Sequence, residues 1–382
     1  MANIEKIITV GIPAFKAENH ICDCLSSIQI QSIRDEVNVI IAKDNPTDNY
    51  EFVKERYPDL DITIIDFDKN TGPGLARQRC LDNCKTPWIT WIDADDIFIS
   101  PFSLESLKKG IFQSTQDKPV IEVQGTFYQE IQNHPAGLRM APRDDVGHPW
   151  VFGRLYNVQF LKSFGIGFSE LRAMEDGELN WKVRISIEGT PMQICMVHEP
   201  IYLWRTGSEH SITRIGVDEN GIPQYNFDLC QWGATEACIR AIKFCRKKNP
   251  FNGSITRFTT EMMVGHYFTY VECLQKKPVF AEQNLFNAKK FYHECYKEIE
   301  KQIDDEVLKN MYTMQMASKA QDLIGIIPEI TFFDFMKKVK EEHYGGVEEF
   351  KEIRKKLPQE IIDNDLKTGV LGILEHEATI EE

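Results

Sequence analysis

The sequence has little that would suit a membrane-spanning, exported or polyanion-binding protein. No uninterrupted apolar run approaches the roughly 20 residues that cross a bilayer, so we predict no membrane span. The start, MANIEKIITVGIP, lacks the basic residues, long apolar stretch and small-residue cleavage site of a signal peptide, which predicts a cytoplasmic protein. The formal net charge of −14 disfavours a broad basic face for nucleic acid, although a local basic groove stays possible.

Several recognisable motifs are also absent. The ten cysteines are scattered over 382 residues, and no second Cys or His pair at zinc spacing accompanies Cys22 and Cys24 or Cys80 and Cys84. We therefore expect reduced, mostly buried thiols and no structural zinc. No P-loop, serine-elbow or kinase signature occurs. The composition, 42% hydrophobic and 27% charged, is typical of a soluble protein of one large or two medium domains.

Apolar runs alternate with helical patterns over the first hundred residues. β-Branched segments predict buried strands at residues 7–13, 38–44, 61–67 and 88–96, and helical spacing occurs between them at 21–28, 50–57 and 75–84. This order implies right-handed crossovers and a mostly parallel sheet. Ligands of such sheets bind beyond the carboxyl ends of the strands, which is where Asp44, Asp93 and Asp95 fall.

The remaining sequence predicts a second, helical part. A strand is expected at residues 120–128, and short helices are expected at 158–164 and 178–187. After about Phe227 the predicted helices are 230–247, 255–274, 281–303, 308–324, 332–342 and 348–356. The segment GVDENGIPQYN predicts a loop near residues 215–228. We therefore expect a catalytic domain at residues 1–220 and an α-helical domain of unknown role at 221–382, with a frayed tail.

The acidic run Asp93-Ala94-Asp95-Asp96 closes the fourth predicted strand. On an extended chain, carboxylates two positions apart project to the same side. Two such oxygens suit a hard divalent cation, Mg²⁺ or Mn²⁺, which keeps open positions for phosphate oxygens. The alternative is a solvated acidic turn in which Asp96 caps a helix.

Four blocks within residues 6–213 resemble, in order, those of the family 2 glycosyltransferases. They are ITVGIPAFKAENHICDCLSSIQIQS, VIIAKDNPTDNY, NTGPGLARQRCLDNCKTPWITWIDADD and AMEDGELNWKV. A last block, HEPIYLWRTGSEHSIT, resembles the Tyr-x-x-Arg strand and mobile loop of that family. The resemblance implies an α/β catalytic domain of the GT-A fold, with a Rossmann-like sheet. It also implies metal-dependent, inverting transfer of a sugar from a nucleoside-diphosphate sugar.

The resemblance further implies which residues hold the donor. The residues implied for nucleotide-sugar binding are Pro13, Ala14, Phe15, Asp44, Arg77, Asp93 and Arg205, and those implied for the metal are Asp95 and His210. Lys43 departs from the pattern, since many members have an acid there, which leaves the nucleotide open. Alternatives stay open for Arg77 as an exposed helix residue paired to a neighbour, for Asp44 as a turn cap, and for His210 as an exposed loop residue.

Asp176 is the candidate general base, with Glu175 beside it in the same block. Inverting transfer needs one carboxylate on the acceptor side to take a hydroxyl proton. The leaving nucleoside diphosphate needs no proton, because the metal neutralises its charge. The alternative is that both acids open a helix and interact with its dipole. Trp150, Arg154 and Trp181 either shape the acceptor side or pack in the core.

The expected partners are a nucleotide-sugar donor and an acceptor whose class stays open: a glycan, a protein, a lipid-linked molecule or a nucleic acid. The helical half offers surface for a homo-oligomer. Two rival functions remain. A nucleotidyltransferase would also use acidic strand ends, but GIPAFKAEN has only one glycine where such enzymes carry a Gly-rich loop. A catalytically inactive nucleotide-sugar-binding scaffold is the other rival, and the intact Asp93, Asp95 and Asp176 speak against it.

Overall fold

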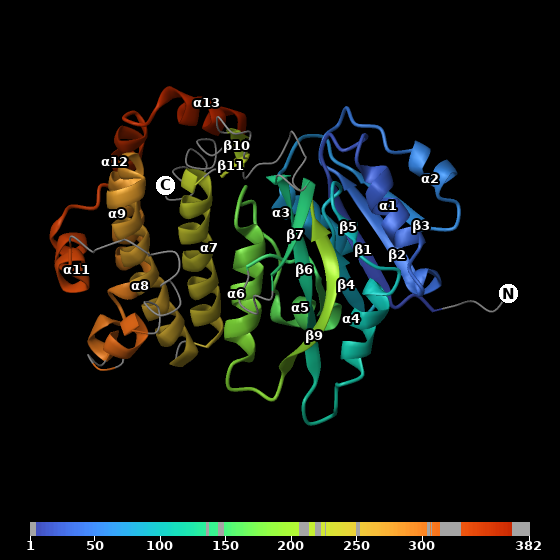
Figure 1. Cartoon of the computed structure of the whole chain (residues 1–382). Helices are drawn as coiled ribbons and strands as arrows, with labels where there is room; N and C mark the ends of the chain where they lie inside the picture. Colours follow the sequence, from blue (N-terminus) through green and yellow to red (C-terminus); the bar gives the residue numbers. More distant parts are fainter. Residues whose placement is uncertain are drawn as a thin grey trace. The chain divides into compact units, whose positions relative to one another are not determined.

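The computed structural model describes residues 5–134, 137–143, 149–205, 214–217, 223–225, 227–249, 253–303, 306, 308–313 and 330–368. The chain divides into two compact units, Met1–Tyr225 and Asn226–Glu382. The first unit is α/β, and the described part of the second is helical (Figure 1).

A twisted sheet forms the centre of the first unit. Its strands are β1 (Ile8–Ala14), β2 (Val37–Lys43), β3 (Asp61–Asp66), β4 (Trp88–Trp91), β5 (Ile97–Phe98), β6 (Val120–His134), β7 (Gly137–Arg143), β8 (Arg154–Asn157) and β9 (Gln193–Trp204). A separate two-stranded sheet consists of β10 (Arg214–Val217) and β11 (Pro223–Tyr225). The helices are α1 (Ile21–Gln29), η1 (Arg34–Glu36), α2 (Phe52–Arg56), α3 (Pro73–Asn83), α4 (Ser103–Ile111), α5 (Val158–Phe164) and α6 (Glu175–Ile187).

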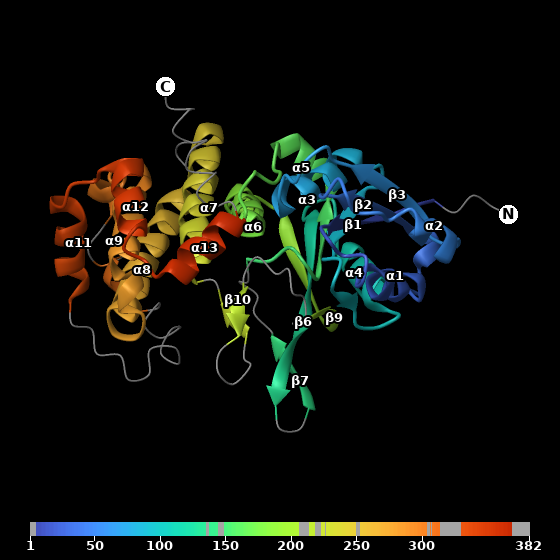
Figure 2. The same cartoon turned by 90° about the horizontal axis from the view of Figure 1, so that it is seen from above.

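The strand order is β3-β2-β1-β4-β8-β6-β9-β5, with β7 paired to β6. The first four strands are parallel neighbours, as the alternating pattern predicts. Strand β8 runs antiparallel to β4 and β6, whereas β9 runs parallel to β6. Figure 2 shows α1 and α4 on one side of the sheet and α3, α5 and α6 on the other. Because both faces are covered, the side chains of Ile8, Val10 and Ile12 in β1 are buried, and each contributes roughly 1.5–3 kcal/mol of transfer free energy.

The acidic run does not lie on an extended strand, so that part of the prediction is wrong. Strand β4 pairs with β1 only as far as Trp91, and the Asp96 amide then donates to the Asp93 carbonyl at 3.0 Å. This bond closes a turn over Asp93–Asp96, and the chain re-enters the sheet at Ile97. Asp93 and Asp95 therefore project from a turn at the carboxyl end of β4, and their directions depend on side-chain partners rather than on strand alternation.

Other predicted boundaries shift for similar reasons. Helix α6 begins at Glu175, ahead of the predicted 178, and β6 continues beyond the predicted 128 because it pairs with β7. The predicted loop near 215–228 contains the β10–β11 hairpin, in which Arg214 lies opposite Tyr225. The predicted helix 281–303 is interrupted by a π-turn at Tyr292–Tyr296. Of the predicted helix 308–324, residues 308–313 are helical and the rest lies outside the described residues.

The second unit is built on three long, adjacent helices. Its helical segments are α7 (Phe227–Lys248), α8 (Gly253–Lys276), η2 (Pro278–Phe280), α9 (Ala281–Phe291), the π-turn η3 (Tyr292–Tyr296), η4 (Glu300–Gln302), α11 (Phe332–Glu341), α12 (Gly346–Arg354) and α13 (Gln359–Thr368). Ion pairs join α7 to α9 and the turns after it: Glu236 with Lys290, Lys243 with Glu294, and Arg246 with Glu298. Two residues of the basic run at the end of α7, Lys243 and Arg246, are thus paired with acids.

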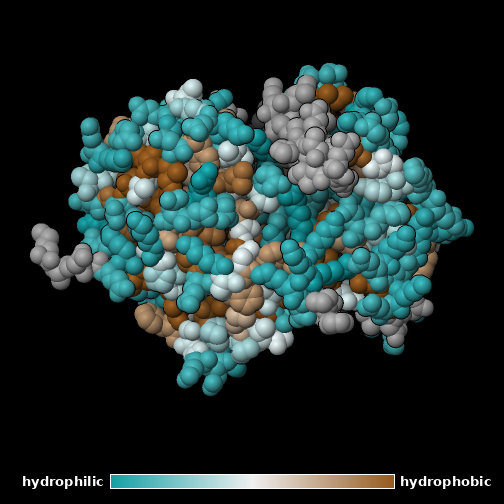
Figure 3. All heavy atoms as spheres, turned by 180° about the vertical axis from the view of Figure 1, so that it is seen from behind, coloured by the Kyte–Doolittle hydropathy of each residue, from teal (hydrophilic) through white to brown (hydrophobic). Residues whose placement is uncertain are grey.

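The surface mixes hydrophobic and hydrophilic side chains. Figure 3 shows hydrophobic spheres among hydrophilic ones on the face that it draws. The exposed large hydrophobic side chains of the described residues are Phe15, Ile30, Phe52, Phe102, Phe112, Val279 and Phe333. Scattered residues of this kind are ordinary on protein surfaces and assign no partner. No helix among the described residues is long and apolar enough to cross a membrane.

Candidate active site

Asp44 fastens the loop that precedes α3. Its Oδ1 accepts hydrogen bonds from the amide and hydroxyl of Thr71, each at 2.7 Å, and its Oδ2 accepts one from the Gly72 amide at 2.8 Å. Gly72 has a φ of +89°, a left-handed conformation that favours glycine. Burial raises the pKa of Asp44, and these hydrogen bonds partly oppose the shift. The Asp44 carboxylate therefore already has local partners, and its contact with a nucleobase stays a prediction.

The turn after β1 exposes Phe15. Pro13 and Ala14 end the strand, while the Phe15 side chain is 37% exposed. Two side chains that the sequence analysis missed hold the next residues: Asp48 Oδ2 accepts from the Lys16 amide at 2.6 Å, and the Tyr50 hydroxyl accepts from the Ala17 amide at 2.9 Å. Both residues lie in the polar segment NPTDNY, whose turn-forming composition could have indicated their role.

Lys43, the departure from the family pattern, has a clear partner. It lies opposite Asp66 in the register of β2 and β3, and its Nζ is 2.6 Å from an Asp66 carboxylate oxygen. A cation in place of the usual acid is thus compensated by an acid at the end of the neighbouring strand. The pair lies at the carboxyl edge of the sheet, beside Asp44.

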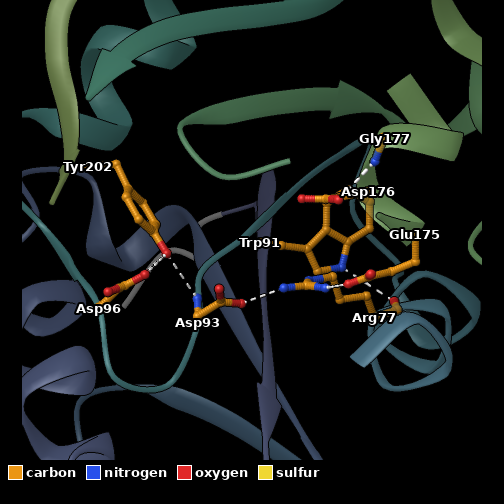
Figure 4. A network of polar contacts seen from close by, with 8 residues as sticks. All are labelled: Arg77, Trp91, Asp93, Asp96, Glu175, Asp176, Gly177 and Tyr202. Atoms are coloured by element: carbon orange, nitrogen blue, oxygen red, sulfur yellow. Dashed lines mark hydrogen bonds and ion pairs between the residues drawn. The ribbon is translucent and has the colours of Figure 1, made fainter. Parts of the chain in front are cut away.

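Arg77 joins the acidic turn to the block that carries Asp176 (Figure 4). Its Nη2 is 2.6 Å from Asp93 Oδ1, and its Nη1 pairs with Glu175 Oε1. Its carbonyl accepts a hydrogen bond from Trp91 Nε1 at 3.3 Å. Burial alone would lower the pKa of Arg77, but Asp93 and Glu175 raise it. The alternative of an exposed helix arginine is wrong, because this side chain is buried between two carboxylates from distant segments.

A close approach of α3 and α6 makes this pairing possible. A Cβ atom on Gly74 would lie 2.2 Å from the Ser169 carbonyl oxygen and 3.1 Å from Glu175 Cβ. Only glycine fits at that position without displacing backbone. Arg77 follows Gly74 by about one turn of α3, so its guanidinium comes to the start of α6. A single glycine thereby brings together two predicted site residues, Arg77 and Glu175.

Asp176 is buried at the first turn of α6. Its Oδ1 accepts a hydrogen bond from the Gly177 amide at 2.8 Å. Met174, in the left-handed region with a φ of +66°, directs the chain into the helix. Burial and the neighbouring Glu175 raise the pKa of Asp176 to about 7, although Arg77 partly opposes the shift. A carboxyl group that titrates near neutral pH is well matched to general-base chemistry.

Asp96 is buried rather than solvated, and it caps no helix. It accepts hydrogen bonds from the Tyr202 hydroxyl at Oδ2 and from the Arg205 amide at Oδ1, the latter at 2.7 Å. The Tyr202 hydroxyl also accepts from the Asp93 amide at 3.3 Å (Figure 4). Burial raises the pKa of Asp96 well above its usual range, and the neighbouring Asp95 and Asp93 add to the effect. Tyr202, which the sequence analysis quoted only as part of a Tyr-x-x-Arg block, thus holds the acidic turn against β9.

Replacing Tyr202 by Phe should destabilise the first unit by about 1–3 kcal/mol, because it leaves a buried Asp96 oxygen without its donor. Thermal unfolding of the two proteins measures the change. Tyr270→Phe is the control, since Tyr270 is also buried but its hydroxyl forms no hydrogen bond with the described residues. Equal melting temperatures for Tyr202→Phe and the parent would show that the Tyr202 hydroxyl does not stabilise the acidic turn.

Arg205, His210 and Asp95 are the remaining residues predicted to bind the diphosphate or the metal. The Arg205 guanidinium pairs with Asp23 of α1 at 2.9 Å, and its contact with a diphosphate stays a prediction. His210 lies outside the described residues. Asp95 is half-buried in the acidic turn. Within the described parts of the chain, no three His, Cys, Asp or Glu residues are grouped so that they could hold a metal ion. A cation here would take much of its coordination from water and a bound diphosphate.

Three residues were predicted either to shape the acceptor side or to pack, and the structure assigns one of them, Arg154, to packing. Arg154 is fully buried and pairs with Glu122, also buried, so it belongs to the interior. Trp150 and Trp181 are half-buried and lie near the start of α6. A separate open cavity of about 750 Å³, lined in part by Thr86, Pro87 and Lys162, lies at the amino end of β4. The acidic turn is at the carboxyl end, so this cavity is not part of the candidate site.

Comparison with known proteins finds relatives of the part that contains Asp44, Arg77 and the acidic turn. Residues 9–152 match the model of glycosyl transferase family 2. This part of the chain is therefore similar to glycosyl transferase family 2 domains. Over 239 residues it is 26% identical to the glycosyltransferase GlyA of Streptococcus pneumoniae, which covers 56% of this chain and 33% of GlyA. Over 92 residues it is 37% identical to the teichoic acid poly(glycerol phosphate) polymerase of Staphylococcus epidermidis, which covers 23% of this chain and 13% of the polymerase. The chain thus spans a third or less of these relatives.

Solved structures agree on the fold. S. aureus TarS 1–349 in complex with UDP-GlcNAc superposes with a TM-score of 0.58 at 16% identity, over 76% of this chain and 81% of that one. The same TarS region in complex with UDP gives a TM-score of 0.58 at 15% identity, over 88% and 93% of the two chains. The predicted α/β fold of GT-A type, followed by a helical C-terminal region, is therefore confirmed.

Proposed function

We propose that the chain is a nucleotide-sugar glycosyltransferase in which Asp176 takes the proton of the acceptor hydroxyl. The observation that carries the proposal is the buried Asp176, whose pKa is about 7, beside an arginine that pairs with the acidic turn of a family 2 domain. TarS, which shares the fold, has been crystallised with UDP and with UDP-GlcNAc. UDP-sugars are therefore the first donors to test.

In the proposed reaction the acceptor oxygen attacks the anomeric carbon of the donor. The new O–C bond forms as the bond from that carbon to the diphosphate oxygen breaks, and the bonding electron pair leaves with the diphosphate. The hydroxyl proton passes to the Asp176 carboxylate. One such base, with a leaving group that needs no proton, gives inversion at the anomeric carbon.

The acidic turn fits a divalent cation, Mg²⁺ or Mn²⁺. Asp95 would hold the ion, since its half-buried carboxylate lies in the turn at the carboxyl end of β4. Such ions need only one or two protein carboxylates when substrate phosphates complete their shell. The bound ion would neutralise charge on the departing diphosphate. The predicted donor contacts of Phe15, Asp44 and Arg205, and that of His210 with the metal, belong to this proposal.

A thermal-shift screen of nucleoside diphosphates and UDP-sugars, each with Mn²⁺ or with chelator, tests the proposal. A nucleotide that binds the folded protein stabilises it and so raises the melting temperature. At a nucleotide concentration of a hundred times the dissociation constant, the free energy of unfolding increases by about 2.7 kcal/mol. We expect a metal-dependent rise in the parent and a loss of the metal dependence in Asp95→Ala. Asp68→Ala, which removes an exposed acid outside the turn, should behave as the parent does. A screen without any shift would count against the proposed function.

A further inference from the structure

A group of aromatic side chains lies beside the candidate base and the acidic turn. Trp150 and Trp204 contact each other with ring centroids 5.6 Å apart, and Phe152 contacts both, at 5.7 Å and 6.0 Å. Phe152 also stacks on Tyr202 at 4.5 Å. Trp150 and Trp204 are half-buried, whereas Trp91 in the core is only 1% exposed. We call the Trp150–Trp204 pair the indole platform; Phe152 stacks on one face of Trp150, and both platform residues are partly exposed.

Hydrogen bonds tie one side of the platform to the helix that carries the base. Asn180 Nδ2 donates to the carbonyls of Pro149 and Trp150, at 2.5 Å and 3.0 Å. Asn180 lies one turn of α6 after Asp176, and Pro149 Cβ lies 3.4 Å from the position that a Cβ on Gly177 would take. Trp150 is thus fixed in position relative to the first turn of α6.

Strand pairing ties the other side to the acidic turn. Trp204 ends β9, and the next residue, Arg205, donates its amide hydrogen to Asp96. Two residues before Trp204, the Tyr202 hydroxyl contacts both Asp96 and the Asp93 amide. An isolated bridge also pairs Phe152 with Trp91, the last residue of β4. The platform therefore lies among the same strand ends as the residues assigned to the donor and to the base.

We propose that the indole platform is the acceptor subsite and that it takes a neutral pyranose ring against its indole faces. This inference rests on the proposed function. Indole faces carry a negative quadrupole, which attracts the weakly positive C–H groups on the flat face of a sugar ring. The net charge of −14 disfavours a polyanionic acceptor. A sugar held there would present its hydroxyl groups beside Asp176.

Nuclear magnetic resonance of the six tryptophan indole N–H groups tests the platform directly in the full chain. The probes are neutral methyl glycosides of glucose, galactose, mannose and N-acetylglucosamine, each added to protein that holds UDP and the diamagnetic ion Mg²⁺. Trp150→Phe and Trp204→Phe assign the two signals. We expect at least one glycoside to shift the Trp150 and Trp204 signals and to leave that of Trp232, in the second unit, unchanged.

Variants then separate ring recognition from simple packing. Trp150→Leu and Trp204→Leu should each raise the dissociation constant of the active glycoside about ten-fold or more, whereas the Phe variants keep an aromatic face and should raise it about three-fold or less. If Leu binds as well as Phe, the aromatic role is refuted. If no neutral glycoside moves either signal, or if only glycerol phosphate oligomers do, the proposal is also overturned. Titration of the parent with UDP and Mg²⁺ alone reports on the proposed function, because a failure to bind the nucleotide would appear before any glycoside is added.

Discussion

Replacing Asp176 by Asn should lower the turnover number by about 10²–10⁴-fold while leaving the dissociation constant of the donor nearly unchanged. The amide fills nearly the same volume and can still accept the hydrogen bond from the Gly177 amide, but it cannot take a proton. Release of nucleoside diphosphate, with water or a sugar as acceptor, measures turnover. Glu188→Gln removes an exposed acid at the other end of α6 and should turn over as the parent does.

The dependence of kcat/KM on pH also tests whether Asp176 is the base. The base must be ionised to act, and the pKa of Asp176 is about 7 because of its burial and of the neighbouring Glu175. We therefore expect kcat/KM to be highest above pH 7 and to fall about ten-fold per pH unit below it. An acidic limb near pH 4, or a residual activity in Asp176→Asn with an unchanged limb, would assign the base to another residue.

Stability should change with pH in the opposite sense. Because the folded-state pKa is raised from the usual 3.8, the folded protein binds a proton that the unfolded chain has lost between about pH 4 and pH 7. This group therefore reduces stability as pH rises through that window. The melting temperature of Asp176→Asn, relative to that of the parent, should increase from pH 4 to pH 7 and then level off. Activity and stability would thus report independently on the same buried carboxyl group.

Local sequence patterns were enough to place much of this site. Asp44, Asp93 and Asp95 follow strands whose apolar, β-branched runs are unambiguous, and parallel strands bring their carboxyl ends to one edge. The start of α6 was predicted less well, because its first turn is acidic and buried, which hides the usual amphipathic signal. The small strand β5 and the turn before it were missed for a similar reason, since the run Trp88–Asp96 reads as one extended segment.

Contacts between distant segments could not be predicted from such patterns. The Arg77–Glu175 pair joins residues 98 positions apart, and it depends on the packing of Gly74 against Ser169. Asp96 and Tyr202 are 106 positions apart, and nothing in the acidic run distinguishes its buried last carboxylate from the half-buried Asp95. Sequence reasoning therefore found the acids but not the groups that position them.

Replacing Arg77 by Met should destabilise the first unit by about 3–5 kcal/mol, the usual cost of removing one partner from a buried ion pair. The change leaves Glu175 buried without its cation and removes the partner that fixes Asp93. Chemical or thermal unfolding of the parent and the variant measures it. Arg79→Met is the matched control, because Arg79 is exposed on the same helix and lies over the Phe67 ring. It should cost no more than about 1 kcal/mol.

Two further measurements distinguish lost charge compensation from lost packing. The deficit of Arg77→Met should shrink as pH falls, because protonation of Glu175 and Asp176 removes the charges that Arg77 compensates. The double variant Arg77→Met with Glu175→Leu should be more stable than Arg77→Met alone, since an apolar pair replaces an uncompensated buried carboxylate. A deficit that stays constant with pH and is deepened by Glu175→Leu would mean that Arg77 acts through its packing. In that case the coupling of the acidic turn to the start of α6 would have to come from other contacts.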